Sequence, residues 1–302
     1  MKKFKGDKEV VLAAVKQDGG TLEFADKKLK NDKKIVLVAV KNITTIGGSD
    51  WALKYASKKL RGNKEIVLAA VKHTEKALLH ADKKLRGNKK IVLAAVKKYG
   101  EALQYADKKL KGNKEIVLAA IKDLSAIGDK YIAPEDRIIS FLEYANKKLK
   151  SDKKFVLAAV KKNGDALKYV DEKFKADKEV VLEAVRSDAR ILYYADESLK
   201  KDKKIILTAL KKNGNSLNYA DESLKNDKEV VLVAVQSDNM RALGFSGASL
   251  KKDKDVVLAA VKINGKSLQY ADTSLKKDKE IVLAAVKENG EALLHSDINL
   301  KK

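Results

Sequence analysis

The sequence predicts an all-α protein, an α-solenoid in which eleven short helix-turn-helix repeats stack into a superhelical array. A motif of about 25 residues, Asp-Lys-Glu-Val-Val-Leu-Ala-Ala-Val-Lys followed by Ala-Leu-x-Tyr-Ala-Asp-x-x-Leu-Lys, recurs from residue 7 to the end. Each copy holds two apolar patterns with helical spacing. A fixed period of roughly 20 to 50 residues with such patterns is typical of solenoids, whose repeats bury apolar faces against their neighbours.

Each repeat opens with an aspartate or asparagine, which we number position 1. These residues are Asp7, Asp32, Asn63, Asn88, Asn113, Asp152, Asp177, Asp202, Asp227, Asp253 and Asp278. Two intervals are longer than the others because of insertions near residues 43–50 and 124–140, in the turn between the two helices. We expect a single array over residues 1–302, with repeats 1–5 in residues 1–151 and repeats 6–11 in residues 152–302.

The first helix is expected to begin at position 1, because Asp and Asn side chains accept hydrogen bonds from the free N–H groups of a first turn. Positions 4, 5, 6, 8 and 9 are apolar, as in Phe155–Val160, and cover more than half of a helical wheel. The invariant alanine at position 8 allows close approach of a neighbouring helix. Several repeats then carry Asn-Gly, as at Asn163-Gly164, which indicates a left-handed C-cap.

The second helix is predicted from leucine at position 16, a small residue at position 19 and Leu or Phe at position 23, which form one apolar stripe. Position 20 is usually Asp, Ser or Asn, as at Asp171, Asp196 and Asp221. Such a residue could cap a separate short turn. The sequence therefore leaves open whether this region is one bent helix or two pieces.

Basic residues outnumber acidic ones and give a formal net charge of +23. The excess is concentrated in residues 1–150, which hold 35 Lys and Arg against 18 Asp and Glu, whereas residues 151–302 hold 30 against 24. Such a charge favours a polyanion, an acidic protein or an anionic membrane surface as a partner.

The sequence has no feature typical of an enzyme. Without cysteine it offers no disulfide, thiolate nucleophile or zinc-thiolate site. His73, His80 and His295 are not spaced with carboxylates as metal ligands, and no P-loop, dinucleotide fingerprint or nucleophile elbow occurs. No signal-peptide core follows residues 1–6, and apolar runs such as Val10–Val15 are too short to span a membrane. We expect a cytoplasmic protein without catalytic activity, cofactor, metal or membrane partner.

The string Asp-Lys-Glu-Val-Val-Leu-Ala-Ala-Val-Lys, followed by Asn-Gly, Ala-Leu-x-Tyr-Ala-Asp and Leu-Lys, resembles a bacterial family of short helical repeats known only as a domain of unknown function. The resemblance covers nearly the whole chain and implies a helical-repeat fold, but it supplies no catalytic or binding residue. The two insertions and the ninth repeat, with Gly244 and Gly247 in its second helix, depart from the pattern.

Positions 2, 10 and 24 carry basic residues in almost every repeat. Positions 10 and 24 lie at expected helix C-termini, where a cation complements the helix dipole. The position 2 lysines lie at N-termini and are expected to form a like-charge row that a polyanion would neutralise. A solvated edge, screened by salt, is the alternative. The residues predicted to bind a polyanion are Lys8, Lys33, Lys58, Lys64, Lys83, Arg86 and Lys89.

Charge also alternates at position 3, where Glu9, Lys34, Glu65 and Lys90 begin a regular series. We expect either exposed ion pairs between equivalent residues of adjacent repeats or a record of growth by copying two repeats at a time. Position 21 changes sign, from lysine in repeats 1–5 to glutamate in repeats 6–8. The first five repeats are therefore the better polyanion platform.

Positions 14, 17 and 21 vary between repeats, as they do in repeat proteins that read a partner repeat by repeat. Free drift at an exposed surface is the alternative. The variable residues predicted to contact a partner are Lys54, Gln104, Lys168, Tyr193, Asn218 and Gln269. An aromatic residue or histidine occupies position 18 throughout, from Phe24 to His295, and we expect these rings to pack between repeats, with base stacking as the alternative.

The two insertions are expected to project from one edge, since insertions in repeat arrays often form the binding face. Trp51, Tyr131 and Arg137 are the side chains predicted to bind there. The alternative is that the insertions only cap or interrupt the stack.

These observations favour a non-enzymatic binding or scaffold protein. The leading partner is a nucleic acid, RNA or single-stranded DNA, held by the basic N-terminal half. The alternative is a protein-binding scaffold, such as a bacterial or mobile-element effector that wraps an acidic partner protein. Self-association through an uncapped C-terminal repeat is also expected to be possible, because terminal repeats normally need a polar cap.

Overall fold

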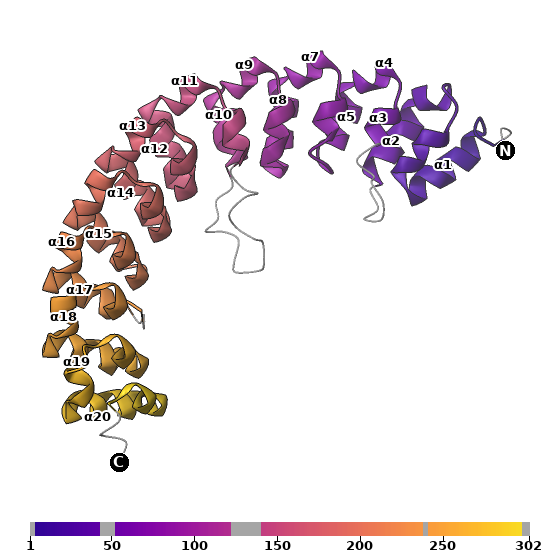
Figure 1. Cartoon of the computed structure of the whole chain (residues 1–302). Coiled ribbons are helices and arrows are strands. Elements are labelled where there is room, and N and C mark those ends of the chain that lie inside the picture. The colour runs from indigo at the N-terminus through magenta and orange to yellow at the C-terminus, as the bar shows by residue number, and fades with distance from the viewer. Residues whose placement is uncertain (1–3, 43–51, 122–139, 238–240, 298–302) are drawn as a thin grey trace. The chain divides into compact units, whose positions relative to one another are not determined.

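The protein is built entirely from short helices over the residues that the structure describes (Figure 1). The computed structural model describes residues 4–42, 52–121, 140–237 and 241–297. The chain divides into two compact units, Met1–Phe155 and Val156–Lys302. Within each unit, short helices pack in locally repeating contacts. The all-α prediction is confirmed.

Repeats 1–10 each contain three helical segments rather than two, and the described part of repeat 11 contains the first two of them. Helix A follows the position 1 cap, a middle segment covers about positions 13–18, and a short edge helix covers about positions 21–24. The middle and edge segments are separate because position 19 is extended, as at Ala106 with φ −69° and ψ 156°. Asp107 at position 20 then caps a new helix by accepting a hydrogen bond from the N–H of Lys109 at 2.9 Å. Of the two alternatives left by the sequence, two pieces is the correct one.

The first unit contains five copies of this arrangement. Its A helices are α1 (Lys8–Gln17), α2 (Lys33–Lys41), α5 (Lys64–Ala70), α8 (Lys89–Lys98) and α10 (Lys114–Ala120). Its middle segments are η1 (Gly19–Phe24), α3 (Ala52–Tyr55), α6 (Ala77–His80), η4 (Gly100–Tyr105) and η6 (Ser140–Tyr144). Its edge helices are η2 (Leu29–Asn31), α4 (Lys58–Arg61), α7 (Lys83–Arg86), α9 (Lys108–Lys111) and α11 (Lys147–Lys150). Helix α12 (Lys153–Lys162) follows.

The second unit repeats the arrangement. Its further A helices are α14 (Lys178–Ser187), α15 (Lys203–Leu210), α17 (Lys228–Val235), α19 (Lys254–Ile263) and α20 (Lys279–Glu288). Its middle segments are η7 (Gly164–Tyr169), η8 (Ala189–Tyr194), η10 (Gly214–Tyr219), η11 (Leu243–Phe245), η12 (Gly265–Tyr270) and η14 (Gly290–His295). Its edge helices are α13 (Glu172–Lys175), η9 (Glu197–Lys201), α16 (Glu222–Lys225), α18 (Ala248–Lys251) and η13 (Leu275–Lys277).

The position 1 residues cap helix A as predicted. Asp7 Oδ1, for example, accepts hydrogen bonds from the N–H groups of Glu9 and Val10 at 2.9 and 3.0 Å. All eleven position 1 residues make at least one such bond. Asparagine caps as well as aspartate because only one side-chain oxygen is needed. The predicted helix starts are confirmed.

The core consists of positions 4, 5, 8 and 9 of helix A and positions 16, 19 and 23. In the second repeat Ile35, Val36 and Ala39 are fully buried, whereas Leu37 at position 6 is only half-buried. Position 6 therefore lies at the margin of the buried arc. Each helix A packs on the next one, α2 on α5 and α8 on α10 in the first unit, α14 on α15 and α19 on α20 in the second.

Backbone hydrogen bonds join successive edge helices. In repeat 1 the N–H of position 20 donates to the carbonyl oxygen of Lys5, just before the repeat, and in the others it donates to the carbonyl oxygen of position 24 in the preceding repeat. The first unit contains the bonds Asp26 to Lys5, Ser57 to Lys30, Asp82 to Arg61, Asp107 to Arg86 and Asn146 to Lys111. The second contains Asp196 to Lys175, Asp221 to Lys200, Gly247 to Lys225, Asp272 to Lys251 and Asp297 to Lys276. These bonds connect each edge segment to the next within each unit's described part. Figure 1 shows the edge helices α4, α7, α9 and α11 of the first unit in a row.

The Asn-Gly pairs do not form the left-handed C-cap that the sequence suggests. Asn264 is extended, with φ −147° and ψ 109°, and it caps the following middle segment by accepting a hydrogen bond from the N–H of Lys266 at 3.1 Å. Glycine is required for a different reason. A Cβ at Gly265 would overlap the carbonyl oxygen of Ala285, the position 8 alanine of the next repeat. The predicted close approach at position 8 is therefore confirmed.

Replacing Gly265 with alanine should lower the free energy of unfolding by about 1–3 kcal/mol, because the new Cβ overlaps a backbone oxygen that cannot rotate away. The same substitution at Gly290 is the control, since a Cβ there meets nothing within 4 Å. Gly290→Ala should leave stability unchanged or raise it by up to ~1 kcal/mol. Urea unfolding measures both variants, and equal effects would refute the steric explanation.

Candidate functional site

In the first unit, the position 2 lysines form ion pairs with acids of the next repeat. Each Nζ lies beside the N-terminus of the following helix A, where the cap or the position 3 side chain supplies a carboxylate. The pairs are Lys8–Asp32 at 2.7 Å and Lys33–Glu65, Lys89–Glu115 and Lys114–Asp152, each at 2.6 Å.

The second unit continues the same series. Its pairs are Lys178–Asp202, Lys203–Asp227 at 2.8 Å, Lys203–Glu229 at 2.6 Å, Lys228–Asp253 at 2.8 Å, Lys228–Asp255 at 2.9 Å, and Lys254–Asp278 and Lys254–Glu280, both at 2.9 Å. From Lys203 onward these lysines contact both the cap and the position 3 acid. We call the whole series the lysine ladder.

The lysine ladder overturns the expected like-charge row. At most position 2 lysines, an acid of the next repeat compensates the unfavourable helix dipole. Lys8, Lys33 and Lys89 are among these, so the reason for assigning them to polyanion binding no longer holds. The hydrogen bond from Lys8 holds the pKa of Asp32 below its usual value. Two position 2 lysines, Lys64 and Lys279 of the last repeat, make no ion pair with any described residue.

The position 3 acids also have a different partner from the expected one. Glu65 binds Lys33 at position 2 of the preceding repeat, and Glu115 binds Lys89 in the same way. Pairing between equivalent position 3 residues is therefore wrong. The hydrogen bond from Lys33 lowers the pKa of Glu65.

The edge helices of the first unit carry a second set of lysines, at positions 21 and 22. These are Lys27, Lys28, Lys58, Lys59, Lys83, Lys84, Lys108, Lys109, Lys147 and Lys148, and all are exposed. Within the described ranges none of them makes an ion pair. We call these ten residues the basic edge. The sequence prediction includes Lys58 and Lys83 but misses the position 22 members, which the recurring Lys-Lys-Leu string could have revealed.

The basic residue at position 24 of each edge helix has a structural role. Lys111 Nζ donates to the carbonyl oxygen of Gln104 at 2.6 Å, at the C-terminal end of the middle segment. Partial burial lowers the pKa of Lys111, and its ammonium lies 5.6 Å from the centre of the Tyr144 ring. Arg86 occupies the equivalent position and is half-buried. The predicted role of position 24 at a helix C-terminus is consistent with this geometry.

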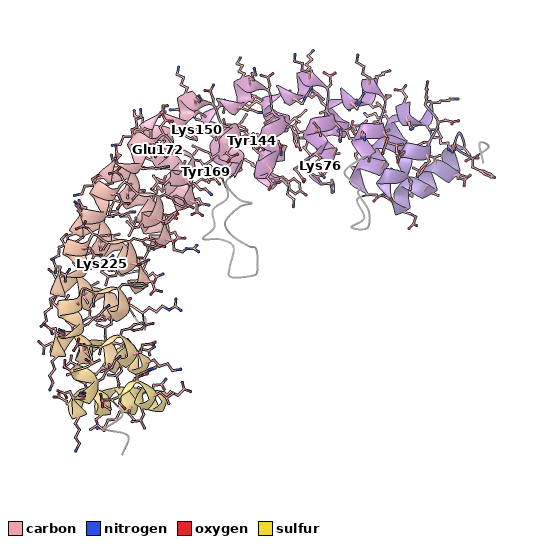
Figure 2. The ribbon with its side chains drawn as sticks, viewed as in Figure 1. Lys76, Tyr144, Lys150, Tyr169, Glu172 and Lys225 are labelled. Atoms are coloured by element: carbon pink, nitrogen blue, oxygen red, sulfur yellow. The ribbon has the colours of Figure 1, made fainter. Side chains whose placement is uncertain are left out.

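The same edge is neutralised within repeats 6–8. Glu172 pairs with Lys175 and Glu197 with Lys200, both at 2.6 Å, and Glu222 pairs with Lys225 at 2.8 Å. Each pair joins positions 21 and 24 of one edge helix. Figure 2 labels one member of two of these pairs, Glu172 and Lys225. The charge difference between the two halves of the sequence is thus located on the edge helices.

The position 18 rings pack against position 17 of the preceding repeat. Lys168 Nζ lies 5.9 Å from the centre of the Tyr194 ring, and Tyr193 meets the Tyr219 ring edge-on with centroids 6.4 Å apart. Burial, with a smaller contribution from Glu23, raises the pKa of Tyr55. The rings therefore contact neighbouring repeats as expected. Position 17 side chains such as Lys168 and Tyr193 pack against them.

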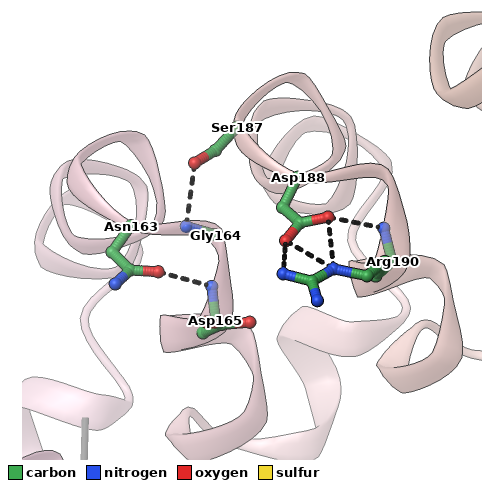
Figure 3. A network of polar contacts seen from close by, with 6 residues as sticks. All are labelled: Asn163, Gly164, Asp165, Ser187, Asp188 and Arg190. Carbon is green, nitrogen blue, oxygen red and sulfur yellow. Dashed lines mark hydrogen bonds and ion pairs between the residues drawn. The ribbon is translucent and has the colours of Figure 1, made fainter. Parts of the chain in front are cut away.

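In the second unit the position 14 residue Arg190 also makes contacts within the protein (Figure 3). The Asp188 carboxylate accepts a hydrogen bond from the N–H of Arg190 at 2.8 Å and two more from its guanidinium at 2.7 and 3.0 Å. Burial opposes ionisation of Asp188, but the bonds from Arg190 outweigh it and lower the pKa. Gly164 N–H donates to Ser187 Oγ at 3.2 Å, which ties this turn to the next repeat.

The predicted variable face is thus partly occupied by contacts within the protein. Lys54 lies over the Tyr55 ring at 5.7 Å, and Gln269 donates to the carbonyl oxygen of Lys266 at 3.1 Å. Asn218 is exposed. Of the predicted insertion residues, Trp51, Tyr131 and Arg137 lie outside the described residues, as do most of the two insertions.

The described part of the chain holds neither a metal-binding cluster nor a membrane-spanning helix. No group of three or more His, Asp or Glu side chains there is arranged to hold a metal ion. None of the helices in that part has the length and apolar character needed to cross a membrane.

Comparison with protein families gives a match along most of the chain. The model described as "Domain of unknown function (DUF4116)" matches residues 7–47, 46–86, 88–135, 139–175, 155–200, 177–222, 202–251 and 253–301. No curated protein and no solved structure matches the chain.

Asp32→Asn should lower stability at neutral pH by no more than about 1 kcal/mol, because it keeps the cap but removes the acid that pairs with exposed Lys8. The folded pKa of Asp32 is below the unfolded value of about 3.9, so this stabilisation exists above that value and is lost as pH falls through the folded pKa. The difference from wild type should therefore vanish in strong acid, well below the unfolded pKa.

The matched control is Asp7→Asn, since Asp7 caps α1 without an ion pair among the described residues. Urea unfolding at several pH values should show no comparable pH-dependent difference for it. An Asp32→Asn difference that persisted in strong acid would mean that the side chain acts through something other than its charge.

Proposed function

The chain belongs to the family of the domain of unknown function DUF4116, and on this premise we propose that it is a non-enzymatic protein that binds a single-stranded nucleic acid, RNA or DNA. The basic edge of residues 1–155 is the proposed contact surface. One observation carries the proposal: ten exposed lysines follow this edge, two per repeat, with no acidic partner in the described ranges.

Many other cations of the described residues already have a partner within the protein. The ladder lysines pair with acids, Lys111 binds a backbone carbonyl, and position 21 of repeats 6–8 carries its own glutamate. Among the described residues, the basic edge has none of these partners. Unpaired lysines beside a phosphate chain release the counterions condensed on it, and that release favours binding.

A single strand suits the spacing of this edge. Packed helices lie ~10 Å apart, so each repeat presents one lysine pair per step of about that length. A flexible strand can bring a phosphate to each step, and a basic groove or edge that follows the backbone is a common feature of single-strand binding proteins. Base stacking is not part of the proposal, since the position 18 rings pack on neighbouring repeats.

We also propose that the repeats form the α-solenoid predicted from the sequence. Two observations support it within each unit: helix A packs on helix A of the next repeat, and the edge helices are joined by backbone hydrogen bonds. Contacts between neighbours are the property that defines solenoid architecture.

An acidic partner protein remains the second candidate because of one surface feature. Tyr193 is 66% exposed and lies beside Tyr194, with ring centroids 5.2 Å apart. Exposed tyrosines are enriched in protein interfaces. This cluster lies in the second unit, away in sequence from the basic edge.

The triple variant Lys58→Gln, Lys83→Gln and Lys108→Gln should weaken binding of a fluorescently labelled oligonucleotide roughly a hundredfold, because each substitution removes about one phosphate interaction. The slope of log affinity against log salt should become shallower by about 2, because each phosphate bound on a single strand contributes ~0.7. Fluorescence anisotropy at several salt concentrations measures both quantities.

The control is Lys16→Gln, Lys72→Gln and Lys97→Gln, which removes the same charge from position 10. These exposed lysines lie at the opposite end of helix A, about 15 Å away for a helix of ten residues. The control should lose much less affinity. Equal losses, or a wild-type protein with no salt-dependent binding, would refute the proposal, and capture of one acidic protein instead would favour the second candidate.

A further inference from the structure

Each repeat offers two acceptor positions to the ladder lysine that precedes it. One is the outer oxygen of an aspartate cap: in Asp32, Oδ1 accepts the backbone N–H groups of the helix start and Oδ2 accepts Lys8. The other is a position 3 acid. Lys203 shows both at once, with Asp227 at 2.8 Å and Glu229 at 2.6 Å. A ladder lysine thus remains paired if either acceptor is present.

Repeats 3, 4 and 5 open with asparagine, which removes the first acceptor. Lys33 and Lys89 remain paired because repeats 3 and 5 have Glu65 and Glu115 at position 3. Lys8 precedes a repeat with lysine at position 3, but there the cap is an aspartate. Only repeat 4 combines an asparagine cap with a lysine at position 3, and Lys64 therefore has neither acceptor.

Beside Lys64, the next repeat therefore has two hydrogen-bond donors, the side chains of Asn88 and Lys90, at the positions where other repeats have carboxylates. Asn88 Oδ1 accepts the N–H of Ile91 at 3.2 Å, so its Nδ2 occupies the position of the aspartate oxygen that binds lysine elsewhere. Helix α5 packs on α8, and equivalent pairs bring the position 2 Nζ within 2.6 Å of the position 3 carboxylate. Lys64 Nζ is thus placed to share an anion with Lys90 and Asn88, neither of which pairs with an acid in the described ranges.

We infer that Lys64, Lys90 and Asn88 form a phosphate-binding site for the nucleic acid, an inference that rests on the proposed function. A phosphodiester presents two anionic oxygens and can replace the missing carboxylate between the two ammonium groups. Edge helix α7 ends at Arg86, two residues before Asn88, so Lys83 and Lys84, which open α7 on the basic edge, lie shortly before Asn88 in the sequence. The site fixes where the strand is held most tightly along an otherwise repetitive edge.

Asn88→Asp and Asn113→Asp test the site as a matched pair. Both keep the helix cap and lower the net charge by one in adjacent repeats. Asn88→Asp supplies the acid that Lys64 lacks, whereas Asn113→Asp adds an acid beside Lys89, which Glu115 already neutralises. We expect Asn88→Asp to weaken binding of the labelled oligonucleotide about fivefold more than Asn113→Asp does, with a salt slope shallower by about 0.7.

Lys64→Gln provides a second test that adds no acid and should reproduce the weaker binding and the shallower slope. Lys16→Gln, outside both the ladder and the basic edge, serves as its control. Equal affinities for Asn88→Asp and Asn113→Asp, with wild-type binding intact, would overturn the phosphate site but leave the proposed function standing. A wild-type protein that binds no oligonucleotide, or binds only an acidic protein, would overturn both.

Discussion

The hydrogen bond between the last carbonyl of one edge helix and the N–H that opens the next is the interaction on which the rest of each unit depends. A helix end leaves carbonyl oxygens without intrahelical partners. Here the next repeat supplies the donor, at 2.8–3.1 Å, and thereby fixes the offset between neighbours. That offset brings position 2 lysines such as Lys33 beside the acids of the next repeat and places the position 13 glycine, as at Gly265, against an alanine carbonyl.

Local chemistry could be predicted from the sequence, whereas the specific partners of most polar contacts between repeats could not. The caps from Asp7 to Asp278 follow from one side-chain oxygen and the N–H groups of a single turn, and all are present. The Asn264-Gly265 turn was misassigned because its conformation is decided by the approach of Ala285, which lies in the next repeat. The partners of Lys33 were missed for the same reason, since the offset between repeats cannot be read from one repeat.

Lysines that look equivalent in the sequence have different electrostatic roles. Lys33 forms an ion pair with an acid of the next repeat. Lys111 donates a hydrogen bond to a backbone carbonyl oxygen and is partly buried. Lys58 is exposed and makes no ion pair in the described ranges. The net charge therefore overstates the surface that is available to a polyanion. The position 21 glutamates have the opposite effect on the net charge of their edge, because each one, such as Glu172, pairs with a lysine of its own edge helix.

The line of hydrogen bonds along the edge helices uses main-chain atoms alone. Aspartate, serine, asparagine and glycine all occupy position 20, at Asp82, Ser57, Asn146 and Gly247, and each donates the same bond. A junction of this kind does not distinguish one copy from another. Repeats can consequently be duplicated, deleted or exchanged during evolution with the connection intact, and selection can then alter the side chains of a single copy without redesigning its neighbours.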